Sequence, residues 1–83
     1  MNKDELAENG EKFYNEKLKH ILEPNEIGKF VAIEPFIEKY YVNEKSLEAI
    51  LAGRAEFPDK LFYLMRVGYP AAHKIGGYVK RNR

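Results

Sequence analysis

The chain has 83 residues, a formal net charge of +1 and no cysteine. This length allows one domain, 1–83, with a single modest core, because a domain of this size buries only about 60–65% of the surface that its unfolded chain exposes. The lack of cysteine excludes disulfides and thiolate metal sites, no apolar run is long enough to span a membrane, and the N-terminus is unlike a signal peptide, so we expect a cytoplasmic protein without membrane association.

Residues 1–10 are polar and acidic and end in Asn9-Gly10, a pair that commonly interrupts helices, so we expect them to be flexible. A helix is expected over residues 11–23, where apolar residues recur on one helical face. Pro24 is expected to end this helix, because the residue before a proline is driven out of the α region. The apolar face consists of Tyr14, Leu18, Ile21 and Leu22.

A β-hairpin is predicted next, and its first strand is apolar on both faces. Phe30 and Ala32 lie on one side and Val31 and Ile33 on the other, because side chains alternate along a strand with a period of two. Such a strand must be central in its sheet and covered on both sides.

The turn of the hairpin, Pro35-Phe36-Ile37-Glu38-Lys39, lacks the Gly, Asn or Asp that tight hairpin turns prefer. Phe36 and Ile37 are two large apolar residues near its tip. They either fold back over the edge of the sheet or form part of a partner surface. Together with Tyr41 on the second strand, they are the candidate protein-binding residues.

The second half of the hairpin leads into a helix. Ser46 is predicted to be its N-cap, and Leu47, Ile50 and Leu51 follow at helical spacing. Gly53 in mid-helix indicates a close approach of the helix to the sheet beneath it.

A third strand is predicted over residues 61–69, so residues 28–69 form a ββαβ core. The right-handed crossover rule allows this strand to lie beside the first, in strand order 2-1-3. The predicted fold class is therefore α+β: an N-terminal helix followed by ββαβ, with helices packed on a small sheet of three or four strands. The sequence of residues 70–79 does not predict one type of secondary structure and is compatible with a short edge strand.

Charge is distributed unevenly along the chain. Residues 1–60 carry nine Lys/Arg and thirteen Asp/Glu, a balance of −4, whereas residues 61–83 carry five Lys/Arg and no acid. The basic tail, residues 78–83, fits a polyanion partner, although a solvated tail has the same composition and the near-neutral isoelectric point speaks against nucleic acid. The candidate nucleic-acid-binding residues are Arg66, Lys74, Lys80, Arg81 and Arg83.

The strand Gly28-Lys29-Phe30-Val31-Ala32-Ile33, with Tyr40-Tyr41-Val42 and Arg66-Val67-Gly68, resembles a family of small uncharacterised prokaryotic proteins built on a Gly-Lys-aromatic-Val-Ala strand. The resemblance covers roughly residues 24–69 and implies the fold. Members of that family are sometimes encoded beside small retropepsin-like aspartic proteases, which implies a protein partner and transfers no catalytic residue. Ile37-Glu38 and Asn43 depart from the family pattern at the hairpin.

Few side chains could carry out catalysis. There is no Cys or Thr, the single Ser is at a helix start, and the two His are far apart, so catalytic triads and metal clusters are not expected. Glu34 and Glu38 flank the hairpin turn, where ordinary surface glutamates are much commoner than an acid/base pair.

We expect no enzyme, no cofactor and no metal site. Elimination favours a non-catalytic protein-interaction or regulatory module, antitoxin-like or accessory, that binds a protein partner or forms a homo-oligomer. The alternative is nucleic-acid binding through the basic C-terminal region.

Overall fold

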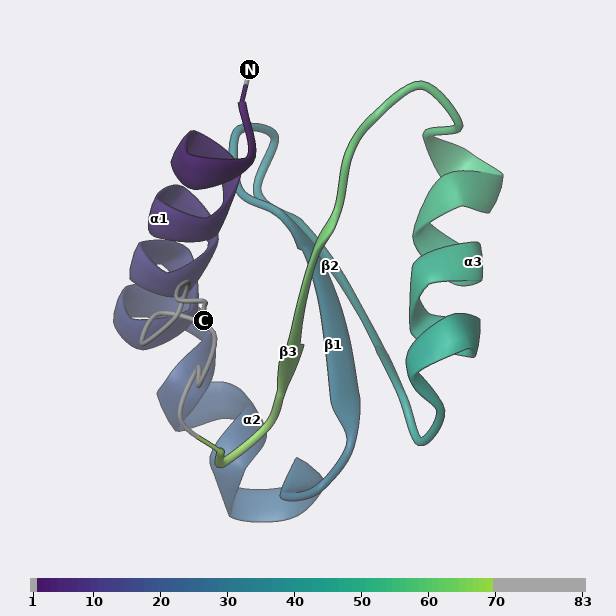
Figure 1. Ribbon diagram of the computed structural model, residues 1–83. Helices are drawn as coiled ribbons and strands as arrows, with labels where there is room; N and C mark the ends of the chain where they lie inside the picture. The colour runs from purple at the N-terminus through teal and green to yellow at the C-terminus, as the bar shows by residue number, and fades with distance from the viewer. Residues whose placement is uncertain (1, 70–83) are drawn as a thin grey trace, which may run out of the picture.

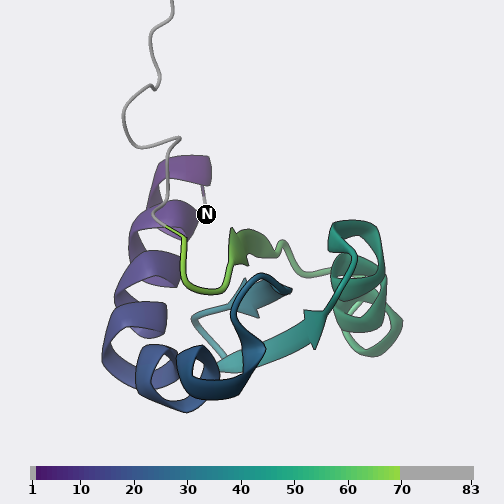
Figure 2. The same ribbon diagram turned by 90° about the horizontal axis from the view of Figure 1, so that it is seen from below.

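A three-stranded antiparallel sheet lies between two helical layers in a computed structural model that describes residues 2–69 (Figures 1 and 2). The order of the strands in the sheet is β2-β1-β3. The α+β class, the N-terminal helix and the ββαβ order are therefore confirmed. The elements are α1 (Lys3–Phe13), the π-helical turn η1 (Tyr14–Leu18), α2 (Lys19–Glu26), β1 (Phe30–Glu34), β2 (Lys39–Asn43), α3 (Ser46–Glu56) and β3 (Tyr63–Arg66).

The N-terminal helix begins at Lys3, eight residues before the predicted start at residue 11. Asn2 caps the helix by accepting a hydrogen bond from the backbone N–H of Glu5, at 2.8 Å. Gly10 does not interrupt the helix, because it lies against the sheet: a Cβ at this position would come within 2.5 Å of the Tyr63 ring. The glycine permits a close approach of helix to strand.

Pro24 does not end the helix either, since α2 continues to Glu26. A proline inside a helix removes one backbone hydrogen bond and crowds the preceding turn. Here the helix ends two residues later, and Leu18 and Leu22 hold it on the sheet. Tertiary packing therefore outweighs the local preference at this position.

Residues on the buried side of the N-terminal helix recur at every fourth position: Leu6, Gly10, Tyr14, Leu18 and Leu22. A regular α-helix turns 100° per residue, so each four-residue step would rotate this stripe by about 40°. The wider π-helical turn η1, with its i→i+5 hydrogen bonds, offsets part of that rotation. One side of the long helix therefore remains on the sheet.

The first strand is the central strand, as predicted. Its residues from Val31 to Glu34 are all 0% exposed. The register pairs Ala32 with Tyr41 of β2 on one side and with Leu64 of β3 on the other.

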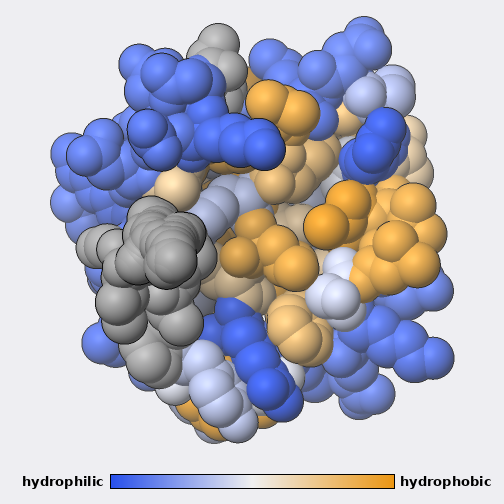
Figure 3. Space-filling model, viewed as in Figure 1, coloured by the Kyte–Doolittle hydropathy of each residue, from blue (hydrophilic) through white to orange (hydrophobic). Residues whose placement is uncertain are grey.

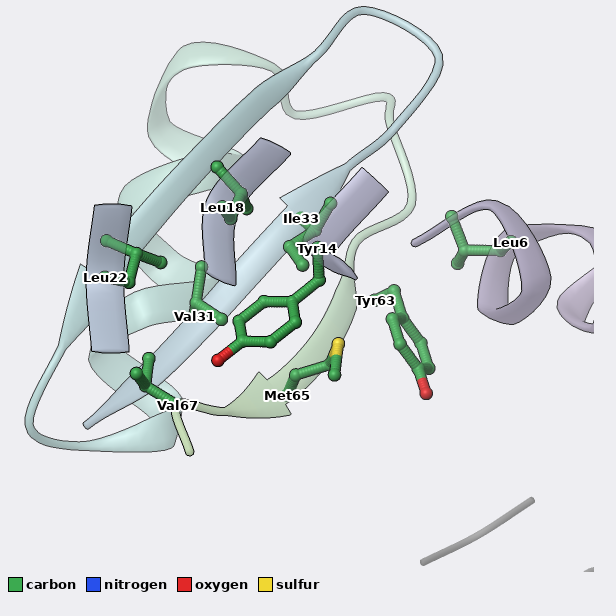
Figure 4. Close-up of a cluster of buried hydrophobic side chains, with 9 residues drawn as sticks. All are labelled: Leu6, Tyr14, Leu18, Leu22, Val31, Ile33, Tyr63, Met65 and Val67. Atoms are coloured by element: carbon green, nitrogen blue, oxygen red, sulfur yellow. The ribbon is translucent and has the colours of Figure 1, made fainter. Parts of the chain in front are cut away.

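The main core lies between the N-terminal helix and the sheet (Figure 4). Side chains from the helix, from one face of β1 and from the same face of β3 meet there as a single hydrophobic cluster. Its members are Leu6, Tyr14, Leu18, Leu22, Val31, Ile33, Tyr63, Met65 and Val67.

The hairpin turn is held by a buried carboxylate. Oε1 of Glu34 accepts hydrogen bonds from the backbone N–H groups of Phe36 (2.8 Å) and Ile37 (2.9 Å). Glu38 adopts a left-handed conformation with φ 56°, the position where a turn usually has Gly or Asn. This buried glutamate explains how the turn forms without the usual turn residues.

The third helix differs from the prediction at its start. Ser46 is its first helical residue, Lys45 occupies the N-cap position, and no side chain caps the helix there. Gly53 does mark a close approach, because a Cβ on it would lie 2.6 Å from the ring of Phe62, just before β3. The third strand itself is shorter than predicted and covers Tyr63–Arg66.

Candidate interaction surface

The two helical layers are offset across the sheet. The α1 helix packs on β1 and β3, whereas α3 packs on β1 and β2. Leu64 of β3 shares the α3 side of the sheet with its partner Ala32, yet Ala32 is fully buried and Leu64 only partly. The α3 side of the sheet is therefore less completely covered at β3 than at β1.

The α3 helix directs small residues toward the sheet and leucines away from it. Ala49 and Gly53 are buried, and at 100° per residue Leu51 lies opposite them, with Leu47 on the adjoining flank. Leu47 is 63% exposed and Leu51 49% exposed. The spacing of the leucines predicted a helix correctly but did not show which side of it is buried. The sequence signal for that is the small pair Ala49 and Gly53, one turn apart.

We call the combined apolar area the α3–β3 surface. Figure 3, viewed as in Figure 1 with β3 in front, shows hydrophobic atoms gathered over α3 and across the middle of the molecule. β3 is an edge strand of the three-stranded sheet, so its outer side pairs with no other strand of residues 2–69. The surface comprises Leu47, Leu51, Leu61, which is 54% exposed, and Leu64.

The three candidate residues of the hairpin have different environments. Phe36 is 51% exposed at the tip, whereas Ile37 is partly buried. The Tyr41 hydroxyl donates a hydrogen bond to Glu56 of α3 at 2.8 Å, and its ring packs edge-on against Phe62 with ring centres 5.9 Å apart. Tyr41 thus joins β2 to α3, and only Phe36 presents most of an apolar ring to solvent.

Arg66 is the candidate nucleic-acid-binding residue that falls within the described range. Its Nε donates a hydrogen bond to the carbonyl of Gly28 at 3.0 Å. Its guanidinium lies 5.3 Å from the ring centre of Phe30 and 4.3 Å from that of Tyr69. The group is therefore occupied by contacts within the protein. Lys74, Lys80, Arg81 and Arg83 lie outside the described residues.

The acidic side chains within residues 2–69 that could be considered for chemistry have different environments. Glu34 is enclosed and holds the turn, and Glu38 is exposed. The buried Glu11 accepts a hydrogen bond from the Tyr63 hydroxyl, and burial together with this bond raises the pKa of Tyr63. No three His, Asp or Glu of this range gather as metal ligands.

An open hollow lies between the end of α2 and β2. It is polar, and its charges are partly paired, because Lys29 Nζ lies 2.7 Å from Glu26 Oε1. Such an open hollow lacks the apolar walls typical of a small-molecule site. Its lining residues are Glu26, Lys29, Val42, Asn43 and Glu44.

Comparison with protein-family models, with curated proteins and with solved structures gives no match. The family resemblance of the β1 motif therefore remains a prediction. Within residues 2–69, no helix has both the length and the apolar character needed to cross a bilayer.

Proposed function

We propose that this chain is a small cytoplasmic, non-catalytic interaction module of a regulatory or accessory kind, which binds a protein partner through the α3–β3 surface. The exposure of Leu47 and Leu51 on α3, with Leu61 also exposed just before the edge strand β3, is the observation that supports it. Large apolar side chains grouped on the surface of a small protein commonly mark an interface.

The chemistry of this surface favours a protein over a nucleic acid. Leucine side chains offer nothing to a phosphate, whereas nucleic-acid binding depends on cations and on aromatic rings that stack with bases. Arg66 and Tyr69 stack on each other instead. Protein interfaces, in contrast, combine apolar anchors with strand edges that accept an additional strand.

The test compares two variants that replace exposed apolar residues on opposite sides of the sheet. The first is Leu47→Gln with Leu51→Gln, and the control is Ile21→Gln on α2, where Ile21 is 52% exposed. Glutamine is a good helix former, so neither change should disturb its helix. Tagged proteins are used to capture partners by cross-linking in native lysate, and mass spectrometry compares the captured proteins.

We expect a protein that binds the wild type and the control but is captured at least about 30-fold less by the double variant, because burial of two leucines contributes at least about 2 kcal/mol. Capture of the partner by the double variant at the level of the wild type would refute the proposal. A loss of capture in the control as large as that in the double variant would also refute it, since binding would then not depend on this side of the sheet. Thermal melts of all three proteins establish that they are folded.

A further inference from the structure

The outward face of α3 carries a regular pattern of residues centred on Leu51. At about 100° per residue, Leu47 and Ala55 lie about 40° to either side of Leu51 around the helix axis. Glu48 and Arg54 lie about 60° to either side of it. These five residues are exposed, on the side of α3 opposite the one packed on the sheet. An apolar line is thus flanked by an acid toward the start of the helix and a base toward its end.

This pattern is complementary to a second copy of itself. When two antiparallel α3 helices are related by a two-fold axis at Leu51, a residue before Leu51 is level with the residue equally far after it in the other copy. Glu48 is then level with Arg54 of the second copy, so opposite charges meet. Leu47 is level with Ala55, so a large side chain meets a small one. Each pair occurs twice, because the axis relates the two copies.

The charges distinguish this arrangement from a parallel one. Parallel copies would place Glu48 level with Glu48 and Arg54 level with Arg54, which brings like charges together. Within one helix these two residues are six positions apart and lie about 120° from each other around the axis, so they do not face each other. The distribution of charge on this face therefore fits an antiparallel second copy.

We propose that the α3 part of the α3–β3 surface binds a second copy of this chain, with the two α3 helices antiparallel about Leu51. The inference rests on the proposed function and names its partner. The helix has 11 residues and is about 16 Å long, so this pairing buries less than the roughly 1,600 Å² of a standard interface. We therefore expect a weak, rapidly exchanging dimer, with a Kd above about 10 μM.

The test is sedimentation equilibrium of the purified full chain from micromolar to millimolar concentration. The variants are the charge reversals Glu48→Arg and Arg54→Glu, singly and together. Each single reversal places like charges level with each other at both ends of the interface, whereas the double reversal restores opposite charges. The double reversal also has the wrong sign of charge at both ends of the helix dipole. Recovered association in it therefore cannot come from a more stable helix.

We expect each single reversal to raise the Kd at least about 10-fold, because attraction is lost and repulsion gained at both ends. The double reversal should return the Kd to within about 3-fold of the wild-type value. Leu51→Gln, on the axis itself, should raise the Kd at least about 10-fold. The matched control Ile21→Gln, at a side chain that is 52% exposed on α2, should leave it unchanged. Thermal melts establish that each variant is folded.

A wild-type chain that stays monomeric at millimolar concentration overturns the proposal. A dimer whose double reversal is as weak as the single ones, or whose Kd does not respond to any reversal, also overturns it. These measurements use the purified chain alone. Capture of a different protein that depends on Leu47 and Leu51 would then still support the proposed function, so the two failures are separate results.

Discussion

Replacement of Ile33 by alanine tests the central position of β1 most directly. Ile33 is 0% exposed and belongs to the main core, between the N-terminal helix and the sheet. Loss of its buried methyl and methylene groups costs their transfer free energy, and the cavity left behind adds to it, so such changes typically cost about 2–5 kcal/mol. Because neighbours on both sides of Ile33 belong to a tightly packed sheet, we expect about 3 kcal/mol.

The measurement is the free energy of unfolding from urea titration. The matched control is Ile21→Ala, the same chemical change at a side chain that is 52% exposed, where we expect less than about 1 kcal/mol. An unchanged m-value would show that both variants unfold from an equally compact state. A loss at Ile33 no larger than the loss at Ile21 would refute the assignment of β1 as the buried central strand.

Glu34→Ala should cost about 1–3 kcal/mol in urea titration, because two backbone N–H groups lose their acceptor, whereas Glu34→Gln keeps an acceptor and should cost less. Phe36→Ser should change stability by less than about 0.5 kcal/mol and Ile37→Ser by about 1 kcal/mol or more, since only the second is partly buried; equal thermal melts would contradict this. The raised pKa of Tyr63 means that the folded state retains this proton more strongly than the unfolded state, so stability should be constant up to about pH 10 and fall above it, less steeply in Tyr63→Phe. Removal of residues 80–83 should leave the melting temperature unchanged and weaken RNA binding with a smaller salt dependence; strong binding that survives would place the site on the folded part of the chain.

The sheet was predictable because the apolar pattern of its strands and the connections between them favour the same arrangement. The first strand is apolar on both faces, so it was expected to be central, and the crossover rule then allowed β3 to lie beside it. The helices packed on the two faces of the sheet supply the cover that such a strand requires. The prediction depended on which faces are apolar and not on the identity of any single side chain.

The ends of the N-terminal helix were not predictable from local preference. Gly10 and Pro24 both discourage a helix in isolation. At Gly10 the Tyr63 ring occupies the space where a side chain would lie, a contact between residues 53 positions apart in the sequence. Such a contact leaves no local signal, so the glycine appears in the sequence as a breaker.

The candidate surface could be predicted only in part. The helical spacing of Leu47, Ile50 and Leu51 predicted a helix but left open which side of it is the buried one. In the structure, Ala49 and Gly53 occupy that side, since small residues let the helix approach the sheet and Phe62 closely. The volume of a side chain thus decides which helical face can be buried, and hydrophobicity alone does not.

The π-helical turn Tyr14–Leu18 makes one place in the N-terminal helix tolerant of a change in length. An i→i+5 turn holds about one residue more than an i→i+4 turn, so a deletion of one residue within it would restore ordinary α-helical geometry and leave the direction of everything before it nearly unchanged. The same deletion in the regular part of α2 would instead turn everything before it by about 100°, with a shift of about 1.5 Å along the axis. Leu6 and Gly10 would then leave the sheet, although neither had been altered.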